Sequence, residues 1–273
     1  MSECNHNCSE CSQADCSSRK IEKLKPNKYS SFKKTFAVIS GKGGVGKSLV
    51  TSLLASALNK KGHSVAIIDA DVTGPSIPQA FGLKGQLSKQ DEEAIYPLIS
   101  KHGIKIMSAN CLLPDPEEPI VWRGPLIAGF VQQLYTDVTY GDVEYLLIDM
   151  PPGTGDIPLT VFQMYPVDGI IVVSSPQELV SMVVAKSINM AKMMCVNIVG
   201  VAMNMAYIKC PKCGENVVVF GNGKYHEEIE KHGLEIISEI PIDPKLASAV
   251  DEGKIEEYET TVMDKIVDQL EKH

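Results

Sequence analysis

A glycine-rich stretch, ISGKGGVGKS (Ile39–Ser48), constrains the fold more than any other feature of the sequence. It has the spacing G-x-x-x-x-G-K-S, with Gly41, Gly46, Lys47 and Ser48 at the fixed positions. An apolar run precedes the stretch and a helical pattern follows it, so its backbone N–H groups can point inward at the start of a helix. The stretch therefore predicts a phosphate-binding loop between a buried strand and a helix.

The motif also predicts the ligands. Lys47 is expected to reach the β- and γ-phosphates of a nucleotide, and the Ser48 hydroxyl to hold Mg²⁺. A second segment, LLIDMPPGTGD, places Asp149 after an apolar run, as expected of a Walker-B carboxylate that holds Mg²⁺ through water. The predicted cofactors are ATP and Mg²⁺. The loop residues predicted to bind them are Gly41, Lys42, Gly43, Gly44, Val45, Gly46, Lys47 and Ser48.

Short apolar runs alternate with helical patterns from Thr35 onward. Six runs, apolar on both faces, are predicted as buried strands, and a seventh, EIISEIP, is weaker. The six are TFAVIS, SVAIIDA, IKIMSA, YLLIDM, GIIVVSS and NIVGVAMN. Helices are expected at 47–60, 124–136, 157–164, 177–193 and 225–232, and an amphipathic helix at the C-terminus. Together with the loop, this alternation predicts an α/β P-loop NTPase fold with a mostly parallel central sheet and helices on both faces.

The first 34 residues differ from the rest of the chain. They are polar, without apolar periodicity, and end in a basic segment. The chain is therefore divided into a flexible, Cys-rich and basic tail, 1–34, and a P-loop ATPase domain, 35–273. The cysteines of the tail are Cys4, Cys8, Cys11 and Cys16. Within the domain, the stretch 73–100 has no regular pattern and is predicted to be a functional or mobile loop.

Composition and charge argue against several classes of partner. The 273 residues are 44% hydrophobic and carry a formal net charge of −8, so neither nucleic acid nor a membrane surface is expected as a partner. The apolar runs are too short to span a bilayer, and the N-terminus lacks the pattern of a signal peptide. A cytoplasmic location is expected. There, eight cysteines indicate metal, cluster or redox chemistry more than disulfides.

The turn CPKCG contains Cys210 and Cys213, which form half of a metal site. Zinc and [4Fe–4S] sites usually need four protein ligands, so two more are required. His226 and His232 complete the spacing of a C₂H₂ zinc finger, but the aromatic and apolar positions of a finger are absent. Two solvated helix histidines explain the match better. The N-terminal cysteines are a second source of ligands, and another copy of the chain is a third.

Lys42, directly after the first glycine of the loop, marks a deviant form of the motif. The loop resembles that of a P-loop class that includes the nitrogenase iron protein, MinD and the arsenite-pump ATPase. In that class this lysine reaches the nucleotide of a partner subunit, where positive charge meets the charge that develops on the γ-phosphate. The resemblance therefore implies a homodimer in which Lys42 acts on the partner's nucleotide.

The same resemblance implies roles for residues at two strand ends. SVAIIDAD is the first switch, in which Asp71, or else Asp69, orients the attacking water. Asn204 would read the adenine, although a structural role is equally compatible with an Asn at the end of a strand. The residues expected to carry ATP hydrolysis are thus Lys42, Lys47, Asp71 and Asp69.

The chain as a whole resembles the Mrp/ApbC-type iron–sulfur cluster carrier ATPases. The resemblance covers about residues 30–255 and rests on GKGGVGKS, DADVTGPSIP, VWRGP, DMPPGTGD, SSPQELV, CPKCG and PIDP, in family order. It implies a homodimer that holds a labile [4Fe–4S] cluster on two Cys210–Cys213 pairs, hydrolyses ATP and passes the cluster to apo iron–sulfur proteins. Arg123, Pro125 and Gln177 lie in these motifs without an assigned chemistry.

The other six cysteines fall into two groups. Those of the tail resemble the four-Cys region of eukaryotic cytosolic relatives, which holds a second cluster, although the spacing here is tighter. A cluster, a zinc ion and a flexible thiol arm are all open, with metal or cluster binding favoured. Cys111 and Cys195 have apolar surroundings in the sequence and are predicted to be buried structural thiols.

Two other functions fit the same loop. A MinD/ParA-type positioning ATPase shares the loop and the dimer, but it needs a basic membrane helix or a DNA-binding surface. The acidic C-terminal segment offers neither, and such a protein has no use for CPKCG. The second alternative is an ATPase whose Cys pair holds a purely structural zinc ion. The sequence favours the cluster carrier over both.

Overall fold

The structure is a computed structural model that describes residues 23–72, 74, 76–92, 94–112, 124–153, 155–176, 180–220 and 225–273. Its strands are β1 (Ser30–Ser40), β2 (Val65–Asp69), β3 (Leu98–Ile99), β4 (Lys105–Ser108), β5 (Gly141–Asp149), β6 (Gly169–Ser174), β7 (Ile198–Met203), β8 (Ile208–Lys209), β9 (Asn216–Val217) and β10 (Ile236–Glu239). Its α-helices are α1 (Lys47–Lys60), α2 (Ile77–Ala80), α3 (Gly124–Thr136), α4 (Asp156–Met164), α5 (Val180–Met194), α6 (Tyr225–Lys231), α7 (Pro244–Asp251) and α8 (Asp264–Lys272). Two 3₁₀ turns are η1 (Ala109–Cys111) and η2 (Ile255–Glu257). All seven predicted strands are present.

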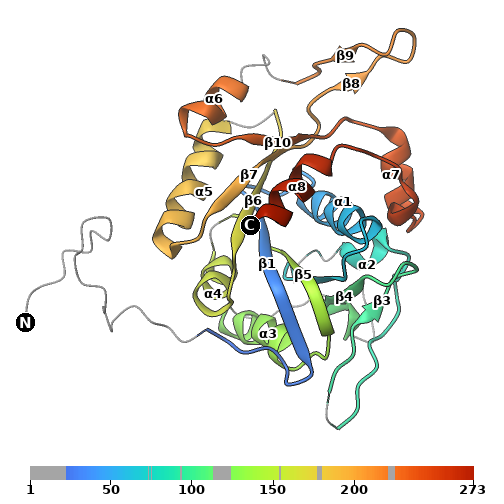
Figure 1. Cartoon of the computed structure of the whole chain (residues 1–273), viewed down its shortest axis with the longest axis vertical. Coiled ribbons are helices and arrows are strands. Elements are labelled where there is room, and N and C mark those ends of the chain that lie inside the picture. Colours follow the sequence, from blue (N-terminus) through green and yellow to red (C-terminus); the bar gives the residue numbers. More distant parts are fainter. Residues whose placement is uncertain are drawn as a thin grey trace, which may run out of the picture.

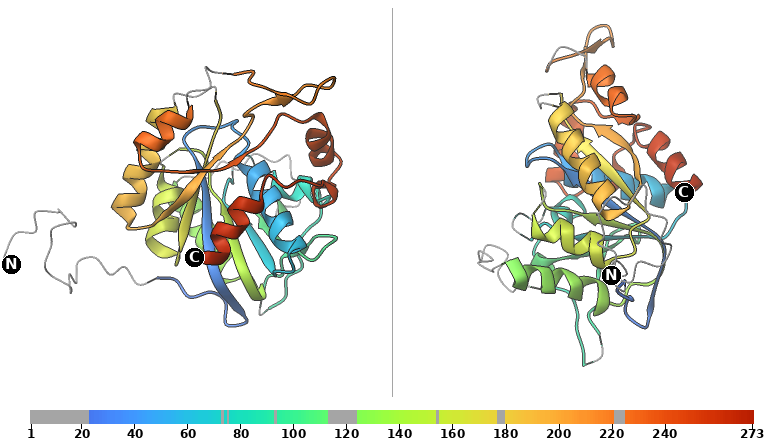
Figure 2. Two further views of the ribbon diagram at one scale, coloured as in Figure 1. Left: turned by 45° about the horizontal axis from the view of Figure 1, so that its top comes forward. Right: turned by 90° about the vertical axis from the view of Figure 1, so that its left-hand side faces the viewer.

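The central sheet has eight strands in the order β10-β7-β6-β1-β5-β2-β4-β3. Each neighbouring pair in this order is parallel apart from the antiparallel pair β3–β4. Parallel strands need crossover connections, so the helices between them cover the faces of the sheet. Figure 2 shows α1 and α8 on one face and α3, α4 and α5 on the other. The predicted α/β fold, with a mostly parallel sheet and helices on both faces, is therefore confirmed.

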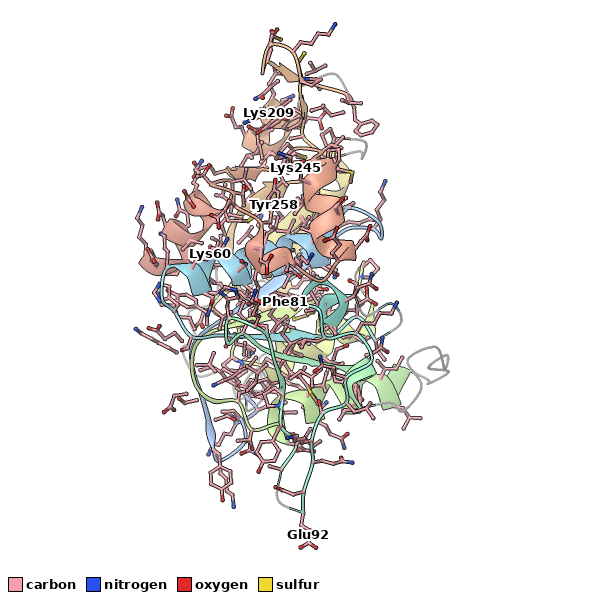
Figure 3. The ribbon with its side chains drawn as sticks, turned by 90° about the vertical axis from the view of Figure 1, so that its right-hand side faces the viewer. Lys60, Phe81, Glu92, Lys209, Lys245 and Tyr258 are labelled. Atoms are coloured by element: carbon pink, nitrogen blue, oxygen red, sulfur yellow. The ribbon has the colours of Figure 1, made fainter. Side chains whose placement is uncertain are left out.

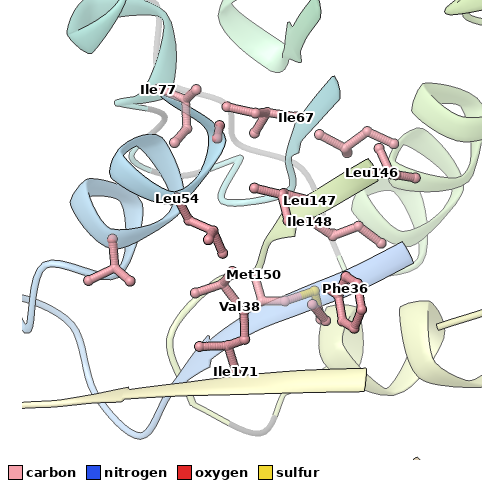
Figure 4. Close-up of a cluster of buried hydrophobic side chains, with 14 of the residues drawn as sticks. Phe36, Val38, Leu54, Ile67, Ile77, Leu146, Leu147, Ile148, Met150 and Ile171 are labelled. Atoms are coloured by element: carbon pink, nitrogen blue, oxygen red, sulfur yellow. The ribbon is translucent and has the colours of Figure 1, made fainter. Parts of the chain in front are cut away.

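An apolar core fills the space between the sheet and its helices (Figure 4). Val38 of β1, Leu147 of β5, Ile171 of β6 and Leu54 of α1 are fully buried within it. Because the central strands are buried on both faces, they read as continuous apolar runs rather than alternating ones. Burial contributes about 1.5–3 kcal/mol for each such side chain, so the loops at the carboxyl ends of these strands rest on a rigid support.

Strand β1 begins at Ser30, before the predicted start of the domain at Thr35. Ser30 pairs with Gly141 of β5, and its hydroxyl accepts a hydrogen bond of 2.8 Å from the backbone N–H of Tyr140. Residues 30–34 alternate between half-buried and exposed, so they show no apolar run in the sequence. Backbone pairing with β5 extends the strand there, five residues before the apolar run that marks it in the sequence.

Two further segments differ from their predicted conformations. The stretch 73–100 contains α2 and β3, and Ile77 of α2 is fully buried, so the segment is not a loop throughout. At the C-terminus only α8 is helical. Ile255 in η2 is fully buried, and the Tyr258 hydroxyl donates a hydrogen bond of 2.8 Å to Asp243 at the start of α7. These contacts hold residues 255–258 against α7. The predicted C-terminal helix therefore begins only at Asp264, the first residue of α8.

The hairpin of β8 and β9 forms a separate two-stranded antiparallel sheet that carries the CPKCG turn. Figure 1 shows that it projects beyond the central sheet. Lys209, the last residue of β8, lies towards one extremity of the molecule, and Glu92 lies at the opposite one (Figure 3). The hairpin follows β7, so it starts from the carboxyl edge of the sheet, the edge at which the phosphate loop follows β1. The fold therefore places the thiol pair and the loop on the same side.

Candidate functional site

The phosphate loop connects the end of β1 to Lys47, the first residue of α1. Gly44 and Gly46 have φ angles of +84° and +82°, in the left-handed region that favours glycine. A Cβ at Gly46 would lie 2.2 Å from Asn204 Nδ2, so close approach also requires glycine there. The N-terminus of α1 meets the loop, as an anion-binding loop requires. The predicted strand, loop and helix are therefore present, and the loop begins at Gly41, directly after β1.

A cavity of about 340 Å³ opens beside this loop. Lys42–Ser48 line it, together with Asp71, Pro152 and Val250. Its volume lies within the roughly 300–1,000 Å³ typical of small-molecule sites. Val250 belongs to α7 and was not predicted, because only the tertiary structure brings α7 to the cavity. The loop, the segments that follow β2 and β5, and α7 thus meet around one volume of nucleotide-binding size.

The two lysines of the loop differ in burial. Lys47 is 6% exposed, and its Nζ lies 2.9 Å from Asp149 Oδ2. Within the described part of the chain, the ammonium of Lys47 has no hydrogen bond of acceptable geometry. A buried ammonium without a hydrogen bond suits an anionic ligand, so Lys47 and the loop around it fit a phosphate group. Lys42, by contrast, is exposed and contributes to the lining of the cavity.

Asp149, the last residue of β5, is fully buried and accepts hydrogen bonds on both carboxylate oxygens. Ser48 Oγ donates to Oδ2 over 2.6 Å, and Thr51 Oγ1 donates to Oδ1 over 2.7 Å. The hydroxyl of Ser48 and the carboxylate are both hard oxygen donors, which suits Mg²⁺. Thr51 was not predicted, although a signal existed. It follows Lys47 by four residues and therefore lies on the same face of α1.

The two aspartates at the end of β2 have different environments. Asp69 is fully buried beside Asp149 in the register of β2 and β5. It accepts backbone hydrogen bonds from Asp71 over 3.2 Å and from Ile77 over 3.4 Å. Burial, and then the Asp149 carboxylate, raise the pKa of Asp69 well above its usual value. Asp71 is half-buried and lines the cavity. Which of them orients water stays a prediction, and the geometry favours Asp71.

Asn204, directly after β7, is 4% exposed. Its Nδ2 donates a hydrogen bond of 2.8 Å to the carbonyl oxygen of Val45 in the loop. Its backbone N–H donates over 2.8 Å to the carbonyl oxygen of Ser174, at the end of β6. The side chain therefore supports the phosphate loop, which is the structural role that the sequence left open. A contact with adenine stays a prediction.

Cys210 and Cys213 lie in the turn between β8 and β9. The backbone N–H groups of Cys210 and Gly214 donate over 2.9 Å to Glu215 and Cys210 carbonyl oxygens, respectively. Cys213 is exposed, Cys210 is half-buried, and neither is in a disulfide. Hydrogen bonds from the backbone N–H groups of Cys213 and Lys212, and from the Cys213 thiol, lower the pKa of Cys210 below its usual value. The turn thus presents two thiols to solvent and favours a thiolate at Cys210.

The described residues contain no group of three or more His, Cys, Asp and Glu side chains arranged to hold a metal ion. In particular, the alternative zinc finger is not formed. His226 Nε2 lies 3.0 Å from Glu239 Oε1 and its ring stacks on Tyr225, while His232 is exposed beyond the end of α6. The predicted residues that lie outside the described part of the chain are Cys4, Cys8, Cys11, Cys16, Arg123 and Gln177.

Of the two remaining cysteines, both predicted to be buried, only one is buried in the structure. Cys111 is buried, and burial raises the pKa of its thiol to about 12, so the predicted buried thiol is confirmed. The prediction for Cys195 is wrong, because this residue is exposed. Cys195 follows α5 with a φ of +54°, and its backbone N–H donates to the carbonyl oxygen of Lys192. It therefore belongs to the surface turn that ends the helix rather than to the core.

A family model described as NUBPL iron-transfer P-loop NTPase matches residues 31–273. The chain belongs to this family. Relatives named iron-sulfur cluster carrier protein include that of Clostridium perfringens, 45% identical over 250 residues that cover 89% of this chain and 87% of the relative. The protein of the same name from Methanocaldococcus jannaschii is 42% identical over 261 residues, covering 93% and 90%. The resemblance inferred from the motifs is therefore confirmed.

Solved structures of relatives agree with the fold. A nucleotide-binding protein from Archaeoglobus fulgidus, in complex with ADP, is 45% identical and has a TM-score of 0.77, covering 85% of this chain and 91% of that one. A chain of the MinC:MinD cell division protein complex of Aquifex aeolicus has a TM-score of 0.60 at 21% identity, covering 88% and 94%. At that identity the likeness shows the fold alone, and MinD is a distant fold relative. The matching family model shows that the chain is a P-loop NTPase, and the ADP complex of the 45% identical relative supports nucleotide binding. Across the described ranges, none of the helices is long and apolar enough to span a bilayer.

Proposed function

We propose that this protein is an iron–sulfur cluster carrier ATPase. Two copies would hold a [4Fe–4S] cluster between their Cys210–Cys213 pairs and transfer it to apo iron–sulfur proteins, coupled to ATP binding and hydrolysis. The observation that carries the proposal is a pair of unbonded thiols on a projecting hairpin, exposed at Cys213 and half-buried at Cys210. This hairpin starts from the same edge of the sheet as the nucleotide cavity, in a chain whose relatives are named as carriers.

The thiol pair has the properties that a transferable cluster requires. Cluster iron is held by thiolates, and the lowered pKa of Cys210 favours that form. Exposure of Cys213 keeps the cargo within reach of an acceptor protein. Two thiolates are half of the usual ligand set, and the described residues supply no third ligand nearby. A second copy of the chain completes the set with two more thiolates.

The surface next to the turn supports pairing of two chains. Val217, Val218 and Val219 follow Cys213 closely in the sequence and are 49%, 49% and 44% exposed. Three adjacent exposed valines on a projecting hairpin are typical of a surface that is covered in an assembly. In a two-fold dimer, a surface near the axis meets its own copy, so the valines of both hairpins would surround the four thiols.

The cavity has the groups needed for ATP hydrolysis. Lys47 would bind the phosphates, Asp71 would orient the attacking water, and Lys42 of the partner would balance charge developing on the γ-phosphate. Ser48 and Asp149 would hold Mg²⁺, which when bound neutralises charge on the phosphates. Cluster and nucleotide would then share one dimer axis. Their binding free energies would be coupled reciprocally, so the cluster would alter the affinity for ATP as much as ATP alters retention of the cluster.

The proposed setting is the cytoplasm, where a reducing environment keeps unpaired thiols available for cluster binding. No nucleic acid and no membrane are needed for this function. The partners are a second copy of the chain and the apo iron–sulfur proteins that accept the cluster.

Anaerobic reconstitution with iron and sulfide tests the proposal. Wild type should bind about four irons with matching sulfide per dimer at this site. A Cys210→Ala/Cys213→Ala variant should lose them, and Cys195→Ala, which removes another exposed thiol, should keep them. Deletion of residues 1–22 separates binding by the N-terminal cysteines from binding by the pair and leaves β1 intact. Stoichiometric zinc without iron at the pair would favour the structural zinc alternative.

The coupling to ATP needs its own measurement. Lys47→Ala and Lys42→Ala proteins, loaded with cluster, should transfer it to an apo-ferredoxin with altered dependence on ATP. Wild type with and without nucleotide provides the reference. Transfer that is indifferent to both substitutions and to ATP would separate the nucleotide site from the carrier role.

A further inference from the structure

Thr51 lies in α1, four residues after Lys47, and is fully buried. Its hydroxyl has two acceptors within reach: Asp149 Oδ1 at 2.7 Å and the Lys47 carbonyl oxygen at 3.1 Å. One hydroxyl hydrogen serves one acceptor well. The carboxylate is charged and closer, and hydrogen bonds to charged acceptors are stronger, so Thr51 donates to Asp149. The phosphate-loop helix is thereby linked to the end of β5 by a side chain outside the loop motif.

The two oxygens of Asp149 therefore face different partners. Oδ2 faces Lys47 Nζ at 2.9 Å and Ser48 Oγ at 2.6 Å, both at the start of α1. Oδ1 faces Thr51, one turn further along the helix. Rotation of the carboxylate about its Cβ–Cγ bond would break all three contacts at once. A carboxylate held at Oδ1 keeps Oδ2 directed at the residues that bind phosphate and metal.

We propose that Thr51 is a positioning residue for Asp149, and that its hydrogen bond to Oδ1 sets the affinity of the site for Mg²⁺-nucleotide. The inference rests on the nucleotide and magnesium assignment of the proposed function and adds a residue to it. Ser48 and Asp149 share a hydrogen bond here, and both are assigned to Mg²⁺. If Mg²⁺ or its bound water took the place of the Ser48 donor, Oδ1 would stay anchored by Thr51 and the carboxylate would keep its orientation. Partners that orient metal-binding carboxylates act on metal affinity in this way.

Substitutions at Thr51 separate the hydroxyl from the bulk of the side chain. Thr51→Val keeps the shape and removes the hydroxyl, Thr51→Ala removes both, and Thr51→Ser keeps the hydroxyl. Thermal unfolding shows which variants fold. Valine leaves Oδ1 buried without its donor, so if Thr51→Val does not fold, the comparison of Thr51→Ala with Thr51→Ser takes its place.

The readout is binding of a fluorescent ADP analogue to the full chain, measured in EDTA and across a Mg²⁺ titration. For Thr51→Val and Thr51→Ala, the Mg²⁺ concentration at half-effect should rise about tenfold or more. Affinity in EDTA should change by less than about twofold, because the hydroxyl acts through the metal-binding carboxylate. Thr51→Ser should follow wild type. A merely structural role would not produce this split between the two conditions.

Two results for the hydroxyl-free variants would overturn the inference. One is a Mg²⁺ titration of the hydroxyl-free variants that coincides with wild type. The other is an equal loss of affinity with and without Mg²⁺, which would make Thr51 a packing residue. If the affinity of the wild-type protein for the ADP analogue does not respond to Mg²⁺, the magnesium assignment itself is contradicted. The inference about Thr51 then fails with it. Iron reconstitution at Cys210 and Cys213 is a separate measurement, so failure of the carrier function is distinguishable from failure here.

Discussion

The carboxamide of Asn204 donates a hydrogen bond of 2.8 Å to the carbonyl oxygen of Val45, which ties the end of β7 to the phosphate loop. The two residues are far apart in the sequence and both are buried. Gly46 lies against the same amide, so the loop and Asn204 fit together closely. The shape of the phosphate loop therefore depends on a strand that the motif itself does not include.

Asn204→Ala should weaken the binding of ATP and of GTP alike, by roughly tenfold, because it leaves the buried Val45 carbonyl without its donor. Fluorescence titration with both nucleotides measures this. Asn197→Ala, at an exposed position before β7, is a matched control that should bind as wild type. A loss confined to ATP would instead indicate that Asn204 reads the adenine, as the family resemblance implies.

Asp71→Asn should lower kcat for ATP hydrolysis by on the order of 10²-fold or more and leave ADP binding intact, since Asp71 lines the cavity where water would be oriented. Asp69→Asn should lower kcat less, because Asp69 is fully buried and contacts the backbone of the first switch. Steady-state phosphate release with both variants gives the comparison. The reverse ranking would assign the water to Asp69.

Val218→Glu should weaken dimerisation by about tenfold or more, because a charge would be buried without a partner between the two hairpins. Sedimentation of the protein without cluster and without nucleotide isolates this contribution from thiolate ligation. Met193→Glu provides the control. Met193 is 75% exposed near the end of α5, which runs back from the carboxyl edge of the sheet. Equal dimer fractions in all three proteins would remove the valines from the interface.

His63 connects the C-terminal helix to the sheet. Its Nε2 lies 2.9 Å from Glu271 Oε1 and its Nδ1 lies 3.1 Å from Glu144 Oε2, and its ring packs edge-on against Tyr145. Hydrogen bonding to Glu271 and then to Glu144 raises the pKa of His63, while Lys61 also pairs with Glu271. The same contacts with His63 lower the pKa values of both glutamates. The protonated imidazole thus stabilises the docked position of α8.

His63→Gln should therefore lower Tm more at pH 6 than at pH 9. A raised histidine pKa contributes stability that is complete below the ordinary value of about 6.5 and is lost as pH rises through the raised value. The lowered glutamate pKa values contribute stability above their ordinary value of about 4.3 that is lost at lower pH, which leaves a window between these limits. Thermal melts of His63→Gln and of the exposed control His232→Gln provide the measurement. Parallel melts at both pH values would contradict an ion pair at His63.

Much of the site was predictable because its signals are local. The bounds of α1 agree with prediction, since the glycine pattern and the helical period after it both act over a few residues. The thiol pair was predictable for the same reason, because the spacing of CPKCG limits the turn. Cys195 was mispredicted because an apolar neighbourhood in sequence says nothing about which way the end of α5 faces.

Sequence alone determined the phosphate-loop motif at Gly41–Ser48, the mostly parallel sheet and the pair of thiols in a turn. Tertiary structure decided that Asp69 lies buried beside Asp149 while Asp71 lines the cavity, and that Thr51 holds the other oxygen of Asp149. Backbone conformation and spacing are set by neighbouring residues, so motifs encode them. Contacts between side chains about a hundred residues apart depend on strand order and register, which the packing of the whole core selects.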